Sequence, residues 1–143
     1  MASVLVVDDS ESIRRGLSLL LRMQGLEARS AEGGAEALDL LAASHPDLIL
    51  LDMSMPEVDG IAVLEQMRQW SHLDDVPVIV YSAIGDEPLK RKAKRLGAAE
   101  FIDKGTAPWE LLASRIFWHL GNSDHSPEET DKDRYPGNGH HFQ

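Results

Sequence analysis

Carboxylates, a hydroxyl and an amine follow four short apolar runs in this sequence. Asp8 and Asp9 come after SVLVV, Asp52 after LILL and Ser82 after PVIVY, while Lys104 closes the segment FIDK. A carboxylate can accept a phosphoryl group as an acyl phosphate. A lysine and a hydroxyl can hold phosphate oxygens, and crowded carboxylates need a cation such as Mg²⁺, which prefers oxygen ligands. Brought together, these residues could carry out magnesium-assisted phosphoryl transfer to an aspartate.

Short apolar runs alternate with amphipathic stretches from residue 3 to about residue 120. Continuous apolar runs are typical of strands covered on both faces of a parallel sheet, and the stretches between them have helical periodicity. Strands separated by helices predict a doubly wound α/β fold with a five-stranded parallel sheet. The predicted strands are Ser3–Val7, Leu26–Ser30, Leu48–Leu51, Pro77–Tyr81 and Ala99–Ile102, and the predicted helices run through Ile13–Leu21, Ala35–Ala43, Ile61–Met67, Leu89–Leu96 and Trp109–Leu120.

The polar residues that follow these strands are expected at one edge of the sheet. Open parallel sheets bind ligands outside the carboxyl ends of their strands. A single aspartate there is more often a turn or helix-capping residue, and a single lysine is more often a solvated charge. The presence of all five at the same edge favours a functional site.

Four segments resemble the receiver domain of two-component response regulators, of the chemotaxis-regulator type. They are VLVVDDS at Val4–Ser10, LILLDMSMPEVDG at Leu48–Gly60, VIVYSA at Val78–Ala83 and FIDKG at Phe101–Gly105. The resemblance covers roughly residues 3–120, and we assign residues 1–120 to the domain. It implies a flavodoxin-like (βα)5 receiver fold with strand order 2-1-3-4-5.

The resemblance also implies a role for each site residue. Asp52 is the expected phosphoacceptor, and Lys104 is expected to pair with the phosphoryl group. Asp8, Asp9, Asp52 and the backbone carbonyl of Ser54 are the expected ligands of Mg²⁺, which Mn²⁺ could replace, with Asp9 the more direct ligand of the acidic pair.

The switch residues implied by the resemblance are Ser82, whose hydroxyl moves toward the phosphoryl group, and Phe101, whose ring turns inward on activation. Ser54 and Ile84 occupy the positions that tune dephosphorylation. Because an apolar Ile84 cannot hydrogen-bond a hydrolytic water, we expect slow self-dephosphorylation. The lysine is commonly followed by a cis proline in the family, but Gly105 stands here, and we expect a trans bond because a non-proline cis bond costs about 2.5–4 kcal/mol.

The expected partners follow from the same resemblance. A histidine kinase or phosphotransfer protein would donate the phosphoryl group, and a downstream protein would read the surface of the fourth helix, fifth strand and fifth helix. The basic run Lys90–Arg95 is either a solvated helix face or part of that surface. Asp103 and Glu110 could pair with it across a twofold homodimer. Such a protein assists its own modification, and we do not classify it as an enzyme.

Composition narrows the function classes further. The chain has 143 residues, a formal net charge of −10 and no cysteine. This acidity argues against direct nucleic-acid binding, and no apolar stretch is long enough for a membrane span. We therefore expect a cytoplasmic protein. The polar segment 121–143 predicts a disordered tail, so the chain is either a stand-alone receiver or a fragment of a larger protein.

Two other functions use similar residues. An aspartate-nucleophile phosphohydrolase of the haloacid-dehalogenase type would share the sheet, the metal and the aspartyl phosphate. Its second aspartate, two residues after the nucleophile, is replaced here by Ser54. A receiver-like interaction module that is never phosphorylated usually lacks one of the acidic or lysine positions, which are all present.

Overall fold

A five-stranded parallel sheet lies at the centre of the protein. The computed structural model describes residues 1–121, and the strand order is β2-β1-β3-β4-β5, as predicted. The strands are β1 (Ser3–Val7), β2 (Glu27–Ala31), β3 (Leu48–Leu51), β4 (Val78–Ser82) and β5 (Glu100–Asp103).

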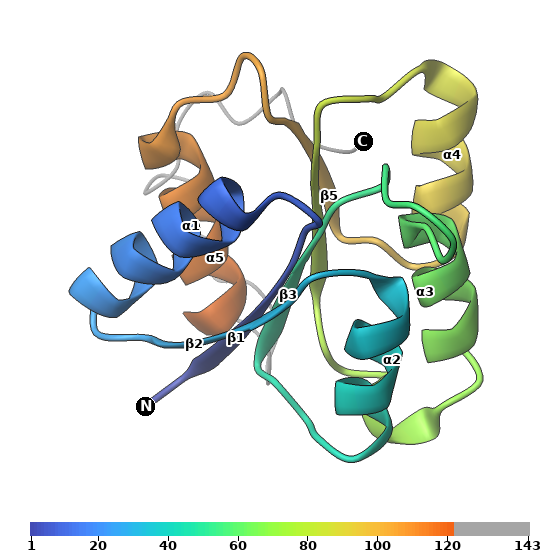
Figure 1. Cartoon of the computed structure of the whole chain (residues 1–143), viewed down its shortest axis with the longest axis horizontal. Coiled ribbons are helices and arrows are strands. Elements are labelled where there is room, and N and C mark those ends of the chain that lie inside the picture. The colour runs from blue at the N-terminus through green and yellow to red at the C-terminus, as the bar shows by residue number, and fades with distance from the viewer. Residues whose placement is uncertain (122–143) are drawn as a thin grey trace.

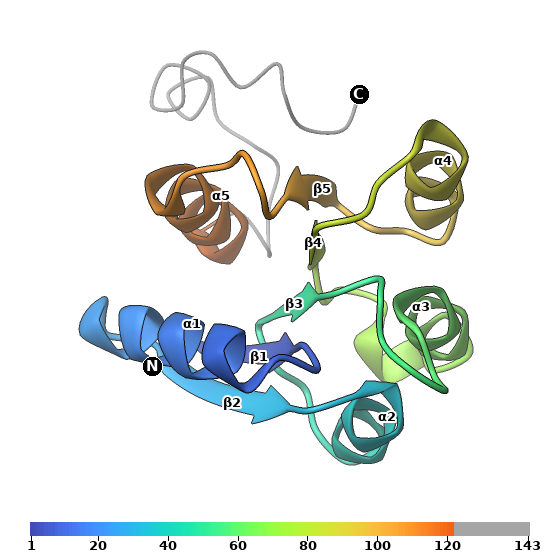
Figure 2. The same ribbon diagram turned by 45° about the horizontal axis from the view of Figure 1, so that its top comes forward.

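Helices cover both faces of this sheet. On one face lie α1 and α5, and on the other lie α2, α3 and α4 (Figures 1 and 2). The helices are α1 (Glu11–Met23), α2 (Gly34–Ala42), α3 (Gly60–Met67), α4 (Glu87–Arg95) and α5 (Trp109–Gly121), with a short 3₁₀ turn at Ser71–Leu73 that the sequence did not predict.

The central strand β3 shows why the strands of this sheet are continuous apolar runs. All four of its residues are buried. Ile49 and Leu51 pack into the core under α2, α3 and α4, whereas Leu48 and Leu50 pack into the core under α1 and α5. Alternate side chains of a strand point to opposite faces, so a strand covered on both faces must be apolar throughout.

Three strands begin and end one residue later than the sequence predicted. The pairs Val7–Ala31 and Ser82–Asp103 are in register at the ends of the ladders. Ala31, Ser82 and Asp103 therefore belong to β2, β4 and β5, and Ser82 is the last residue of its strand, not the residue after it. Gly25 and Gly97, which follow the ends of α1 and α4, have positive φ angles of 85° and 93°, a backbone conformation that favours glycine.

Local capping begins three helices next to the carboxyl edge of the sheet. The side chains of Ser10, Asp59 and Asp86 accept hydrogen bonds from backbone N–H groups in the first turns of α1, α3 and α4. These N-caps satisfy donors that the helix itself leaves free, and they place the three preceding loops at the same edge.

The last helix, α5, continues to Gly121, one residue beyond the predicted domain end. Residues 122–143 of the predicted tail lie outside the described residues. Within residues 1–121, no helix combines the length and the apolar character that crossing a bilayer requires.

Candidate functional site

Asp8 and Asp52 are held by the sheet itself at the carboxyl ends of the adjacent strands β1 and β3. The N–H of Asp8 donates to the carbonyl of Ala31 at 3.2 Å, and the N–H of Asp52 donates to the carbonyl of Val7 at 3.0 Å. The parallel hydrogen-bond pattern thus continues one residue past each strand, which fixes both backbones.

The three carboxylates predicted to hold a cation do converge. One oxygen from each of Asp8, Asp9 and Asp52 lies within 4.8 Å of the others. Asp8 and Asp52 are 3% and 5% exposed, whereas Asp9 faces solvent. Three carboxylates at this spacing form a hard oxygen donor set of the kind that Mg²⁺ takes, so the residues present fit a divalent cation.

Lys104 brings a positive charge into contact with two of these carboxylates. Its Nζ lies 2.7 Å from Asp8 Oδ2 and 3.6 Å from Asp52 Oδ2, and its side chain is 16% exposed. The N–H of Lys104 donates to the carbonyl of Ser82 at 2.9 Å, which anchors its backbone to the end of β4. One ammonium does not neutralise three carboxylates, so the cluster retains an excess of negative charge.

The Ser82 hydroxyl, which is buried, donates to Asp52 Oδ1 at 2.9 Å. The N–H groups of Met53 and Ile84 both lie 3.4 Å from Ser82 Oγ as donors. The hydroxyl is therefore oriented toward the carboxylate by backbone groups from two loops, after β3 and after β4.

Burial sets the protonation behaviour of the site. It raises the pKa of Asp52, although the Ser54 N–H, the Lys104 ammonium and the Ser82 hydroxyl act in the opposite direction. Burial also works to lower the pKa of Lys104, but the contacts with Asp8 and Asp52 outweigh it and raise that pKa. The contacts with Asp8 and Asp52 favour the ammonium form of the lysine, while burial makes the ionised Asp52 carboxyl less favourable than that of an exposed aspartate.

Phe101, on β5, lies inward. Its side chain is 5% exposed and contributes to the core, and Lys90 Nζ lies 5.7 Å from the centre of its ring. The ring occupies the space next to Gly85, where an added Cβ would come within 2.7 Å of Phe101 Cε1. Sequence reasoning missed Gly85, because only the folded chain brings it against the ring.

The two tuning positions differ in their contacts. The N–H of Ser54 donates to Asp52 Oδ1 at 3.3 Å, whereas the Ile84 side chain is 47% exposed beside the site. No peptide bond in residues 1–121 is cis, so the Lys104–Gly105 bond is trans, as expected.

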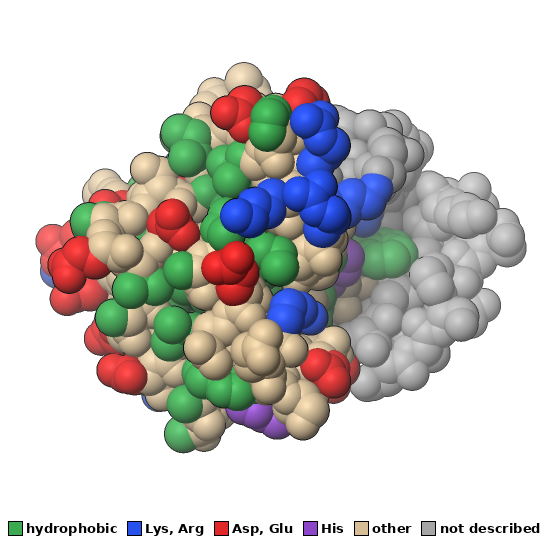
Figure 3. Space-filling model, turned by 90° about the vertical axis from the view of Figure 1, so that its right-hand side faces the viewer, with side chains coloured by type: hydrophobic (Ala, Val, Ile, Leu, Met, Phe, Trp, Pro, Cys, Tyr) green, Lys and Arg blue, Asp and Glu red, His purple; other side chains and the backbone are tan. Residues whose placement is uncertain are grey.

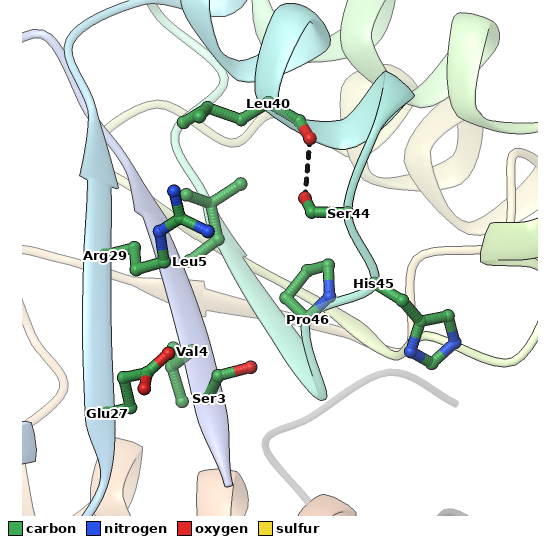
Figure 4. Close-up of a pocket in the computed structure, with 9 residues that line it drawn as sticks. All are labelled: Ser3, Val4, Leu5, Glu27, Arg29, Leu40, Ser44, His45 and Pro46. Atoms are coloured by element: carbon green, nitrogen blue, oxygen red, sulfur yellow. Dashed lines mark hydrogen bonds between the residues drawn. The ribbon is translucent and has the colours of Figure 1, made fainter.

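A second contact that sequence reasoning missed is made by Arg14. Its Nη1 donates to the carbonyl of Asp8 at 2.7 Å, which ties α1 to the loop that carries the acidic pair. A pocket elsewhere, of about 200 Å³, lies between β1, β2 and the end of α2, and Arg29 and Glu27 line it (Figure 4). It shares no residue with the acidic cluster.

The family comparison agrees with this geometry. The sequence model of the response regulator receiver domain matches residues 4–115. The chain belongs to this family. The chain spans only 22% of the length of one curated relative, AtoC of Escherichia coli, and 54% of another, MprA of Mycobacterium sp..

Relatives and solved structures place the receiver domain among regulatory proteins. It is 42% identical over 108 residues to the regulatory protein AtoC of Escherichia coli K12, covering 76% of this chain and 22% of AtoC. It is 32% identical to the chemotaxis protein CheY4 of Vibrio cholerae, with a TM-score of 0.74, covering 82% and 98% of the two chains. Response regulator TrrA of Thermotoga maritima, solved in complex with Mg²⁺-BeF, gives 28% identity and a TM-score of 0.74, covering 83% and 99%.

Proposed function

We propose that this receiver domain accepts a phosphoryl group on Asp52, with Mg²⁺ bound, and thereby changes a surface that a partner protein reads. The observation that carries this proposal is the convergence of Asp8, Asp9 and Asp52 within 4.8 Å, with Lys104 and Ser82 in contact with the Asp52 carboxylate. The complex of the related TrrA with Mg²⁺-BeF supports the proposal of a bound metal ion. Mn²⁺ would serve the same ligands.

The phosphoryl group would come from a histidine kinase or a phosphotransfer protein. A carboxylate oxygen of Asp52 forms the new P–O bond while the P–N bond of the donor phosphohistidine breaks and the imidazole leaves. A bound Mg²⁺ would neutralise charge on the phosphoryl oxygens. Asp8, Asp9 and the Ser54 carbonyl would hold that ion, with Asp52. Lys104 would move its charge from Asp52 Oδ2 to a phosphoryl oxygen.

The change would then reach the surface formed by α4, β5 and α5. Ser82 would leave its bond to Asp52 Oδ1 and donate to the phosphoryl group. The Phe101 ring, which is already buried here, would keep its inward position in the active state. Exposed basic residues of α4, namely Arg91, Lys92, Lys94 and Arg95, form a positive surface on this side of the molecule (Figure 3). That surface would contact a downstream protein or, in a homodimer, Asp103 and Glu110 of a second copy.

The domain is a phosphoacceptor, not an enzyme with a separate substrate, and we place its action in the cytoplasm. The exposed Ile84 side chain offers no hydrogen bond to a hydrolytic water, so the phosphoryl group is expected to be long-lived. Substitution of Ile84 by Asn should shorten that lifetime, and an unchanged lifetime would contradict the role of this position.

Incubation with Mg²⁺ and acetyl phosphate, followed by intact mass measurement, tests the main proposal. We expect a gain of one phosphoryl group in the unmodified chain and in Asp39→Asn, which changes an exposed carboxylate of α2. Asp52→Asn should show no gain, and removal of Mg²⁺ should abolish it. A folded chain that gains no mass with any donor would instead be an interaction module that is never phosphorylated.

A further inference from the structure

A polar groove between α1 and β2 shares no lining residue with the acidic cluster or with the α4-β5-α5 surface. It has a volume of about 330 Å³, at the small end of the range for ligand sites. Three arginines against one glutamate give its lining a formal charge of +2, in a chain whose total is −10. The lining residues are Glu11, Arg14, Arg15, Ser18, Arg22 and Ser30.

Two of the arginines are anchored at the groove by backbone carbonyls. Arg14 Nη1 donates to the carbonyl of Asp8 at 2.7 Å, and Arg22 Nη2 donates to the carbonyl of Ala28 at 3.2 Å. A guanidinium has five N–H donors, so each retains donors for a ligand. Because the tethers already restrict these long side chains, binding would cost less conformational entropy than it does at free surface arginines.

The remaining polar groups complete the lining. Ser18 is only 7% exposed, and none of the side-chain hydrogen bonds found within residues 1–121 involves its hydroxyl, which can therefore donate to a ligand. The single acid, Glu11, lies 4.0 Å from Arg15, and both side chains are largely exposed. Such an exposed pair is weak, so Arg15 can turn to a stronger anion.

We propose that this groove binds a phosphate monoester carried by a small molecule. A monoester phosphate bears close to two negative charges at neutral pH and has three acceptor oxygens. Its charge matches the +2 lining, and planar guanidinium groups bind phosphate in a bidentate manner. A carboxylate or a phosphate diester carries a single charge and would leave part of the lining uncompensated.

The test is a titration of the full chain with glycerol 3-phosphate at pH 7.5, followed by amide chemical shifts and by calorimetry. Asp52→Asn without Mg²⁺ is used as the background, so that the acidic edge cannot take up phosphate. We expect one saturable site, with shift changes centred on α1 and β2. Arg22→Gln should weaken binding at least tenfold, and dimethyl phosphate, a single-charged diester, should bind at least tenfold more weakly.

Arg29→Gln is the matched control. It also removes one arginine charge, but Arg29 lies on β2 and lines the other pocket, with Leu5 and Leu40 (Figure 4). Affinity within twofold of the background is expected for this variant. Equal weakening by Arg22→Gln and Arg29→Gln, equal binding of the diester, or shifts that do not saturate would each overturn the site, and the amide spectrum shows in every case whether the variant is folded.

Discussion

Two groups of charged side chains are buried in this domain. At the carboxyl edge of the sheet, Asp8 and Asp52 share the single ammonium of Lys104. Between β5 and α5, Glu100 Oε2 lies 2.6 Å from Arg115 Nε and 2.5 Å from His119 Nε2. The first group has more carboxylates than cations. In the second, the Glu100 group, a guanidinium and an imidazole contact one carboxylate.

The two groups shift their carboxyl pKa values in opposite directions. Burial alone would raise the pKa of Glu100, but His119 and Arg115 outweigh it and lower that pKa. At Asp52, burial prevails and the pKa is raised. The Glu100 group therefore stabilises a buried negative charge, whereas the acidic edge has too little positive charge for its carboxylates. A deficit of this kind is useful where a cation and a phosphoryl group are to bind.

The largest expected effect comes from disrupting the Glu100 group. Glu100→Gln removes the negative charge that contacts the buried Arg115 side chain, and removal of one partner of a buried ion pair typically costs about 3–5 kcal/mol. We expect a loss of this size in the free energy of unfolding, measured by urea denaturation. Glu110→Gln, an exposed change on α5, the helix that carries Arg115, should have little effect. A similar small loss for both variants would show that the group contributes no net stability.

The same group should respond to acid. Because the folded-state pKa of Glu100 is lowered from its ordinary value of 4.5, its contribution to stability is complete above pH 4.5 and is lost as the pH falls through the lowered value. The difference in unfolding free energy between the parent chain and Glu100→Gln should therefore be constant near neutral pH and shrink in acid. A difference that stays constant to pH 2 would contradict this origin.

A second, smaller effect is expected where Gly85 packs against Phe101 beside the acidic edge. In Gly85→Ala the new methyl group would lie 2.7 Å from Phe101 Cε1 and 3.1 Å from Cζ, so the ring or the loop must move. Overpacking of this kind typically costs about 1–3 kcal/mol. We expect that loss in the free energy of unfolding.

Two further variants show whether the ring is the cause. Adding Phe101→Leu to Gly85→Ala should recover part of the loss, because the smaller side chain leaves room for the methyl group. Gly16→Ala, in α1, has nothing within 4 Å of the new Cβ and should stabilise the helix by about 0.5–1 kcal/mol. A loss in Gly85→Ala that Phe101→Leu does not change would place the strain elsewhere.

The sequence predicted the acidic edge better than it predicted the Glu100 group. Asp52 follows a continuous apolar run, and the parallel-sheet rule brings such strand ends together without any knowledge of side-chain contacts. Direct contacts were beyond this rule: the Lys104–Asp8 bond joins residues 96 positions apart. Nothing in the sequence distinguishes Glu100, because its partners Arg115 and His119 lie in α5 and meet it only through tertiary packing.

A carboxyl-to-amide substitution at the acidic edge should stabilise the protein, in contrast to the same substitution in the Glu100 group. Asp52→Asn removes a charge that burial disfavours, while its side-chain oxygen can still accept from Ser82 and Lys104 can still pair with Asp8. We expect a gain of about 1 kcal/mol in unfolding free energy without Mg²⁺, whereas Glu100→Gln, also a carboxyl-to-amide change, causes a loss.

Saturating Mg²⁺ should reverse the order of the parent chain and Asp52→Asn. A ligand that binds only the folded state at a hundred times its dissociation constant adds about 2.7 kcal/mol, and the parent chain should gain most of this. Asp52→Asn should gain less, because it has lost one carboxylate of the cluster. If Asp52→Asn is less stable than the parent without Mg²⁺, the carboxylate excess does not strain this edge, and the contrast with the Glu100 group fails.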